Sequence, residues 1–153
     1  MNAALRQRAA ALNLMADENR RLRLQFGADC CERVRRFVEN PEVLLCLDGL
    51  QDQLTHFIDN TALEALADTA NRLANQHPGS RSLDGCGHAA VSATYAIARA
   101  LAGAPLEAAD YAAYASVYGE GGYGAVYDRQ SFEPEFQWQV DCLERLARAV
   151  GSQ

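Results

Sequence analysis

Apolar residues recur every three or four positions through most of the chain, which is the pattern of helices with one buried face. Asp17 is expected to cap a long helix that ends near Val38. Asn40 and Pro41 then mark the start of a second helix, because proline is favoured in the first helical turn. The expected apolar stripes of these two helices are Leu24, Ala28, Cys31, Val34 and Val38, followed by Val43, Leu47, Leu50, Leu54 and Phe57.

Further helices are delimited by capping and turn residues. Thr61 and Glu64 have the spacing of a capping box, so we expect a helix to begin at Thr61 with Leu63, Leu66, Ala70 and Leu73 inward. Asp84 is expected to cap the helix after that. Other helices are expected over 2–14, 85–102, 105–118 and 134–150, with a loop at 77–80 and an irregular glycine-rich segment at 119–131. The last helix is expected to turn Phe136, Val140, Leu143, Ala147 and Val150 inward.

Composition supports a helical fold. The chain has 153 residues, of which 28 are alanine, and it has no useful run of alternating apolar and polar residues. We predict an all-α fold, a single bundle of six to seven helices around an alanine-rich central helix at 85–102. The whole chain, 1–153, is expected to form one domain, in which residues 1–16 are a more loosely attached N-terminal helix rather than a signal peptide.

The charge and the cysteines narrow the class of protein. A net charge of −6 argues against a nucleic-acid binder, and no apolar run is long enough to span a bilayer. Five cysteines without a regular framework indicate reduced thiols and a cytoplasmic protein. Residues 1–40 hold eight arginines and five acids, whereas residues 41–153 hold six arginines and 15 acids. We expect most of these charges to pair within the chain.

Three sequence patterns could indicate a dinucleotide site, a catalytic cysteine or a metal site, but an ordinary structural role explains each of them better. Residues 119–124 match the dinucleotide fingerprint G-x-G-x-x-G, but a helix is expected before them where that site needs a strand. Cys86 and His88 could form a nucleophile and base, yet close neighbours on a helix rarely face each other. The histidines and cysteines lack the spacing of a metal site. We therefore expect no cofactor, no metal and no enzymatic activity.

The segment 107–138 is the most informative for function. Five of the six tyrosines lie there, among acidic residues and a single arginine, Arg129. Tyrosines are enriched at binding hot spots, and acidic residues steer a basic partner. The alternative is that these tyrosines only pack helices together. The residues expected to contact a protein partner are Tyr111, Tyr114, Tyr118, Glu120, Tyr123, Tyr127, Asp128 and Glu133.

Three segments together resemble one protein family. They are 28–34 (ADCCERV), 87–100 with its GHAA and YAIARA elements, and 135–139 (EFQWQ) followed by Leu143. In this order they resemble the all-helical immunity proteins of bacterial polymorphic toxin systems. The resemblance implies a protein that binds and neutralises a cognate toxin without catalysing a reaction.

Sequence and resemblance lead to one hypothesis and two alternatives. The hypothesis is a cytoplasmic immunity protein that blocks the active site of a basic toxin domain through 107–138, joined by the loop at 77–84. One alternative is a small helical enzyme that uses Cys86 and His88. The other is a helical scaffold or dimerisation module with the alanine-rich helix at a self-interface, so a homo-oligomer remains open.

Overall fold

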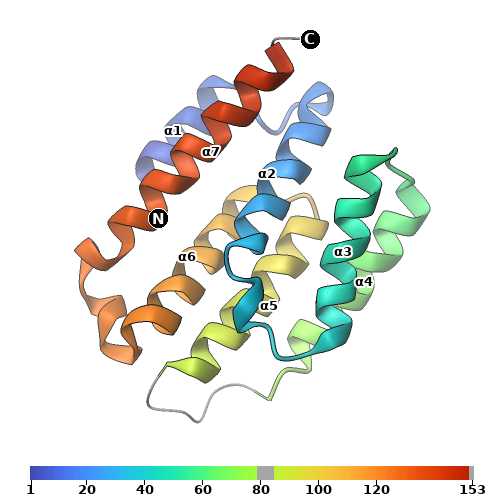
Figure 1. The fold of residues 1–153 in the computed structure, drawn as a ribbon. Helices are drawn as coiled ribbons and strands as arrows, with labels where there is room; N and C mark the ends of the chain where they lie inside the picture. The colour runs from blue at the N-terminus through green and yellow to red at the C-terminus, as the bar shows by residue number, and fades with distance from the viewer. Residues whose placement is uncertain (79–84, 152–153) are drawn as a thin grey trace.

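The computed structural model describes residues 1–78 and 85–151. Within that part of the chain all regular structure is helical, which confirms the all-α prediction (Figure 1). The α-helices are α1 (Ala3–Ala11), α2 (Arg20–Glu32), α3 (Pro41–Thr55), α4 (Asn60–Asn75), α5 (Cys86–Leu101), α6 (Pro105–Gly121) and α7 (Glu133–Gly151). Short 3-10 helices join them: η1 (Asp17–Asn19), η2 (Arg35–Phe37), η3 (Tyr123–Tyr127) and η4 (Arg129–Phe132).

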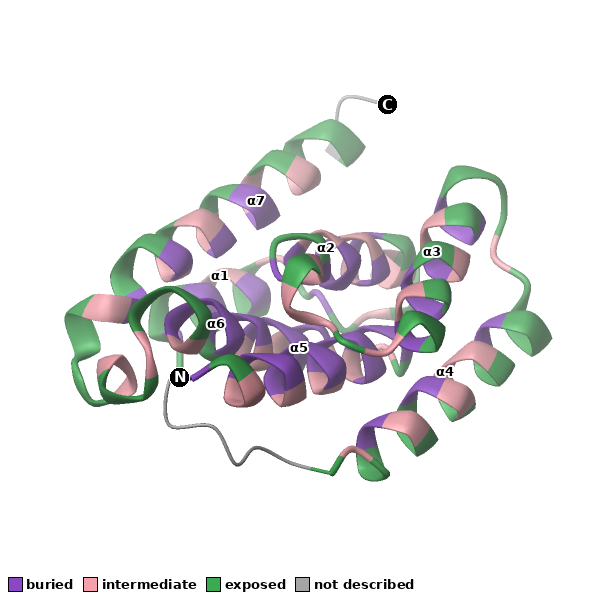
Figure 2. Cartoon of the chain, turned by 60° about the horizontal axis from the view of Figure 1, so that its bottom comes forward, coloured by how far each residue is buried: buried purple, intermediate pink, exposed green. Residues whose placement is uncertain are grey.

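The helices α5 and α6 form the centre of the bundle. They make the most extensive helix pair, and α2 packs on both of them. The helices α1 and α7 lie together at one side, whereas α3 and α4 lie together at the other (Figure 1). Buried residues therefore concentrate on α2, α5 and α6 (Figure 2).

Small side chains allow this close packing. The alanines of α5 that the sequence marks as a small-residue stripe (Ala89, Ala90, Ala93, Ala96 and Ala100) are all buried. A Cβ atom on Gly27 of α2 would lie 3.1 Å from the Cβ of Ala100 in α5. At this point the backbones of the two helices therefore pack with almost no side chain between them. Because the chain itself covers the alanine stripe, that stripe is not the exposed self-interface of the dimerisation hypothesis.

The helix expected from Asp17 to Val38 is shorter than predicted. Residues 17–19 form a separate 3-10 turn, and α2 runs only from Arg20 to Glu32. After α2 the backbone forms a tighter turn. The Val34 amide donates to the Cys31 carbonyl, 3.0 Å away, so this hydrogen bond spans three residues and not the four of an α-helix. Val34 is nevertheless fully buried and Val38 half-buried, so the apolar stripe was predicted better than the helix that carries it.

Three further local predictions were wrong. The cap of α4 is Asp59, whose Oδ1 accepts from the amides of Thr61 and Ala62, so the helix begins before the expected Thr61. Phe57 is 74% exposed, because α3 ends at Thr55 and no longer carries it inward. Val150 is also exposed, as are its neighbours at 148 and 149, so no element covers the last turn of α7.

The glycine-rich segment is more ordered than expected. Helix α6 continues to Gly121, and most of the remainder up to Phe132 forms η3 and η4. The expected cap Asp84 and most of the 77–84 loop lie outside the described residues. Among the described residues, no helix combines the length and the apolar character required to cross a membrane.

Candidate protein-contact surface

Six aromatic rings from three parts of the chain stack into one group. We call it the aromatic cluster: His88 of α5, Tyr114 and Tyr118 of α6, and Tyr123, Tyr127 and Phe132 of η3 and η4. The His88 ring stacks on Tyr118 with centroids 4.9 Å apart and contacts Tyr123 at 5.1 Å. Tyr123 continues to Tyr127 at 6.1 Å, and Tyr114 meets Phe132 edge-on at 5.4 Å. The structure thus brings together four of the predicted tyrosines.

Two glycines permit this assembly. Gly85, which precedes α5, has a φ of 91°, and a Cβ atom there would lie 2.5 Å from the carbonyl oxygen of Tyr118. Gly122, which follows α6, has a φ of 79° and donates its amide to the same carbonyl at 3.0 Å. Both conformations favour glycine over residues with a side chain. The start of α5 therefore reaches the end of α6, which places His88 beside Tyr118.

The outer tyrosines of the cluster offer ring faces and hydroxyls to a partner. Tyr127 is 76% exposed, Tyr123 is 42% exposed and Tyr114 is 37% exposed, whereas Tyr118 is half-buried. Burial raises the pKa of Tyr118, and the hydrogen bond between the hydroxyls of Tyr127 and Tyr123, 3.5 Å apart, raises the pKa of Tyr127. Both phenols therefore stay neutral near pH 7 and can donate hydrogen bonds.

Tyr111 belongs to a different contact. Its ring stacks on Tyr95 of α5 with centroids 5.3 Å apart, and the Tyr95 hydroxyl donates to Asn75 at the end of α4. Tyr111 is half-buried against the main core. Among the predicted contact residues, it therefore fits the alternative explanation, the packing of helices, better than a role in binding.

The predicted acidic residues differ in how much charge they leave free. Glu120 forms an ion pair with Arg36 at 2.9 Å, and both side chains are more than half exposed. Asp128 accepts from the amide of Gln130 and so caps η4. Within the described residues, Asp128 and Glu133 form no ion pair, and both are exposed. They are therefore the acids of this surface that are available to a basic partner.

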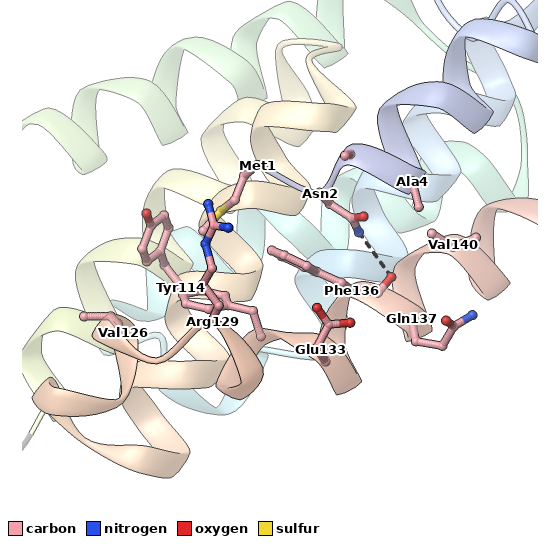
Figure 3. A pocket seen from close by; sticks show the side chains of 12 residues that line it. Met1, Asn2, Ala4, Tyr114, Val126, Arg129, Glu133, Phe136, Gln137 and Val140 are labelled. Carbon is pink, nitrogen blue, oxygen red and sulfur yellow. Dashed lines mark hydrogen bonds between the residues drawn. The ribbon is translucent and has the colours of Figure 1, made fainter.

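A cavity of about 610 Å³ opens beside the aromatic cluster (Figure 3). Its apolar lining includes Val126, Phe132 and Phe136. The polar side chains of Tyr114, Arg129 and Glu133 also line it (Figure 3). Met1 and Asn2 contribute from the N-terminal side, and the Asn2 amide donates to the carbonyl of Phe136 at 3.1 Å. Of the residues that line it, only Tyr114 and Glu133 were predicted as contact residues. Helical spacing marked Phe136 as inward, but no sequence signal placed it at a cavity.

An ion pair between α2 and α7 holds the beginning of α7 in place. The guanidinium of Arg33 donates to both carboxylate oxygens of Glu135, at 2.7 and 3.1 Å, and it lies over the Trp138 ring at 4.3 Å. The Glu135 side chain is only 6% exposed, and the pair raises the pKa of Arg33. Because η4 leads directly into α7, this pair also positions the cavity border.

The two residues of the alternative enzyme hypothesis, Cys86 and His88, both lie at the beginning of α5. Cys86 is exposed in the first turn of α5, and the ring of His88 lies against two tyrosines. Residues 119–121 are the last turn of α6, so the fingerprint at 119–124 follows a helix and not the strand that a dinucleotide site requires. In the part of the chain that the structure describes, no three His, Cys, Asp or Glu side chains lie close enough to hold a metal ion.

The other four cysteines are buried free thiols. Burial raises the pKa of Cys30 and Cys31 strongly and raises the pKa of Cys142 to about 12. Neutral, inaccessible thiols are poor nucleophiles, so these cysteines are core residues.

Comparisons with known proteins found no match, whether with protein-family models, with curated proteins or with solved structures.

Proposed function

We propose that this chain is an immunity protein of a bacterial toxin system, which acts in the cytoplasm by binding a basic toxin domain and covering its active site. The observation that carries the proposal is the aromatic cluster, whose outer tyrosines are exposed while contacts with neighbouring rings, mostly edge-on or tilted, hold them in place. Tyrosines that are already ordered lose little conformational entropy on binding, which is why they serve as anchors at interfaces.

The cavity beside the cluster supports the same function. Binding hot spots usually consist of an anchor side chain that enters a pocket on the partner. Here a pocket with both apolar and polar walls adjoins exposed tyrosines, and Glu133 lines it together with Arg129. A lysine or arginine of the toxin can place its aliphatic part against Phe136 and its charge beside Glu133.

The first experiment is co-expression with the neighbouring gene, which is the expected source of the toxin. We expect the neighbouring gene alone to arrest growth, this chain to restore growth, and the two proteins to elute together from a sizing column. Restored growth without a complex would instead indicate an enzymatic antidote and would direct attention to Cys86. A harmless neighbour would contradict the proposal.

Variants then locate the interface. Tyr123→Ala and Tyr127→Ala are expected to weaken the complex about tenfold each, because each removes an exposed anchor without leaving a core cavity. Met15→Ala is the control, since Met15 is also a large exposed side chain but lies between α1 and η1, outside both proposed surfaces. If both tyrosine variants bind with unchanged affinity, the aromatic cluster is not the interface.

The absence of lysine allows a direct chemical test of the same interface. All 14 basic residues are arginine, so a carbodiimide cannot join the acids of this chain to lysine side chains of another copy. Crosslinks from Asp128 or Glu133 to lysines of the toxin would therefore report the interface directly. We expect these two acids to crosslink in preference to Asp17 and Glu18, which are exposed on η1.

A further inference from the structure

A second open hollow lies between α3 and α4, on a different edge of the molecule from the aromatic cluster (Figure 1). We call it the α3–α4 groove, and its volume is about 890 Å³. Its walls are mostly apolar and include Phe57, Ala62 and Leu66. The floor depends on Gly49, because a Cβ atom there would lie 2.8 Å from Leu66.

Phe57 is held outward by the fixed connection between the two helices. The buried Gln53 side chain accepts from the amide of Asp59 at 3.1 Å, which closes the turn. Arg21 of α2 donates to the carbonyl of Leu54 at 2.6 Å, which holds the end of α3. Ile58 packs against the core, so its neighbour Phe57 must point to solvent. The exposed phenylalanine is therefore an ordered feature of the turn.

A second large apolar side chain lies on the same face. Leu45 of α3 is 66% exposed, and positions 45, 49, 52 and 56 follow helical spacing along one stripe. Phe57 lines the groove, and Leu45 lies one helical turn before its lining residue Gly49, on the same face of α3. Contiguous exposed apolar surface with a polar border is typical of protein-binding sites.

The charge at the groove is negative. Asp52 has a side chain that is 76% exposed, and its only ion-pair partner among the described residues is His56. Asp59 also lines the groove, and no arginine is among the described residues that line it. Two copies of this chain would bring like charges together here, because each copy carries the same two aspartates and a net charge of −6. A basic partner has the complementary charge.

We infer that the α3–α4 groove is a second docking surface, which binds a basic amphipathic helix of another protein. The apolar face of that helix would pack on Phe57 and Leu66, and its lysines or arginines would reach Asp52. This is the helix-in-groove mode, in which residues one helical turn apart enter the groove. The surface is separate from the aromatic cluster, so both can be occupied at once.

The test uses a synthetic leucine–lysine peptide of about 18 residues, long enough to form an amphipathic helix. Binding is followed by amide chemical shifts of the full-length chain. We expect shifts centred on residues 49–66, and we expect Phe57→Ala and Asp52→Asn each to weaken binding about tenfold. Val150→Ala, which truncates an exposed apolar side chain in the last turn of α7, outside both proposed surfaces, should bind like the wild type.

Two control peptides separate shape from charge. A peptide with serine in place of leucine keeps the charge, and a peptide with glutamate in place of lysine keeps the apolar face; we expect both to bind at least tenfold more weakly. Equal binding of the serine peptide would overturn the inference, because charge alone would then explain the shifts. It would also be overturned by a concentration-dependent dimer that Phe57→Ala abolishes, since a second copy would then occupy the groove.

Discussion

At the scale of single residues, a buried polar network joins three helices. Gln139 of α7 is fully buried, and it donates to the carbonyl of Ala109 in α6 at 2.9 Å. It also accepts from the side chain of Asn2, which in turn caps α1 by accepting from the Leu5 amide. Buried polar groups stabilise a fold only when they are paired, so each member depends on the others.

Gln139→Leu is expected to lower the free energy of unfolding by about 1–3 kcal/mol. The substitution removes one of the two acceptors of the Asn2 amide and the side-chain partner of the Ala109 carbonyl inside the core. Urea unfolding followed by circular dichroism measures the change. Gln137→Leu is the control, because Gln137 is exposed on the same helix and is expected to change stability by less than about 0.5 kcal/mol. Equal effects would mean that the buried network contributes nothing specific.

The ion pairs of Arg33 and Arg36 allow a second comparison. Glu135→Ala is expected to lower the free energy of unfolding by about 1.5–3 kcal/mol, because it leaves Arg33 without the carboxylate to which it makes two bonds. Glu120→Ala breaks the solvent-exposed pair with Arg36 and is expected to cost at most about 1 kcal/mol. Thermal unfolding of both variants shows which substitution lowers the stability more. A larger loss of stability for Glu120→Ala than for Glu135→Ala would contradict the prediction.

The sequence could not reveal these long-range contacts. Spacing identified the buried faces that contain Leu24, Leu47 and Leu143, since burial of apolar stripes follows from helical geometry. The spacing gave no sign that Gln139 would be buried. The burial of a glutamine depends on hydrogen-bond partners from elements that are distant in the sequence, here Ala109 and Asn2. The stacking of His88 on Tyr118 was missed for the same reason, since 30 positions separate them in the sequence.

At the scale of elements, apolar patterns predicted which helices exist better than where they end. The end of α2 at Glu32 and the start of α4 at Asn60, capped by Asp59, depend on individual backbone and side-chain bonds. The capping-box pattern placed the cap of α4 at Thr61 and missed Asp59, whose carboxylate accepts from two free amides at once. The glycine content of 122–132 predicted an irregular segment, but most of it forms 3-10 helices. This regular structure depends on the ring contacts of Tyr123 and Tyr127, which the glycine content does not reveal.

The close approach of α2 and α5 gives a prediction at this scale. Gly27→Val is expected to lower the free energy of unfolding by about 1–3 kcal/mol, since the added carbons must separate α2 from Ala100. Gly124→Ala is the control, because a Cβ atom there has no neighbour within 4 Å. Denaturant midpoints compare the two. A stable Gly27→Val protein would show that the helices can move apart without loss of packing.

At the scale of the whole molecule, the uneven charge is largely satisfied internally. Arginines of the first 40 residues form ion pairs with acids of the remainder, as expected: Arg6 with Asp110, Arg8 with Glu144, Arg33 with Glu135, Arg35 with Asp48 and Arg36 with Glu120. The acidic count of 107–138 therefore overstates the charge offered to a partner. Among the described residues, acids without an arginine partner remain at the cavity (Glu133) and in the α3–α4 groove (Asp52 and Asp59), which are the two surfaces proposed for binding.

The composition also determines how the molecule responds to alkaline pH. There is no lysine, and arginine stays charged, so the side chains that titrate above pH 9 are tyrosines and thiols. Burial raises the pKa of Cys30, Cys31 and Cys142 above the ordinary thiol value of 9.0. Above pH 9 the unfolded chain therefore loses protons that the folded chain keeps, and proton loss favours the unfolded state.

Stability is accordingly expected to be constant near neutral pH and to fall from pH 9 towards 12, the raised pKa of Cys142. Each buried thiol contributes a slope of up to about 1.4 kcal/mol per pH unit in that window. Cys142→Ala should make the decline shallower, whereas Met15→Ala, which removes an exposed side chain that does not titrate, should leave it unchanged. Urea unfolding at pH 7, 9 and 10.5 measures the slopes. Identical slopes for both variants would show that tyrosines, and not core thiols, control alkaline unfolding.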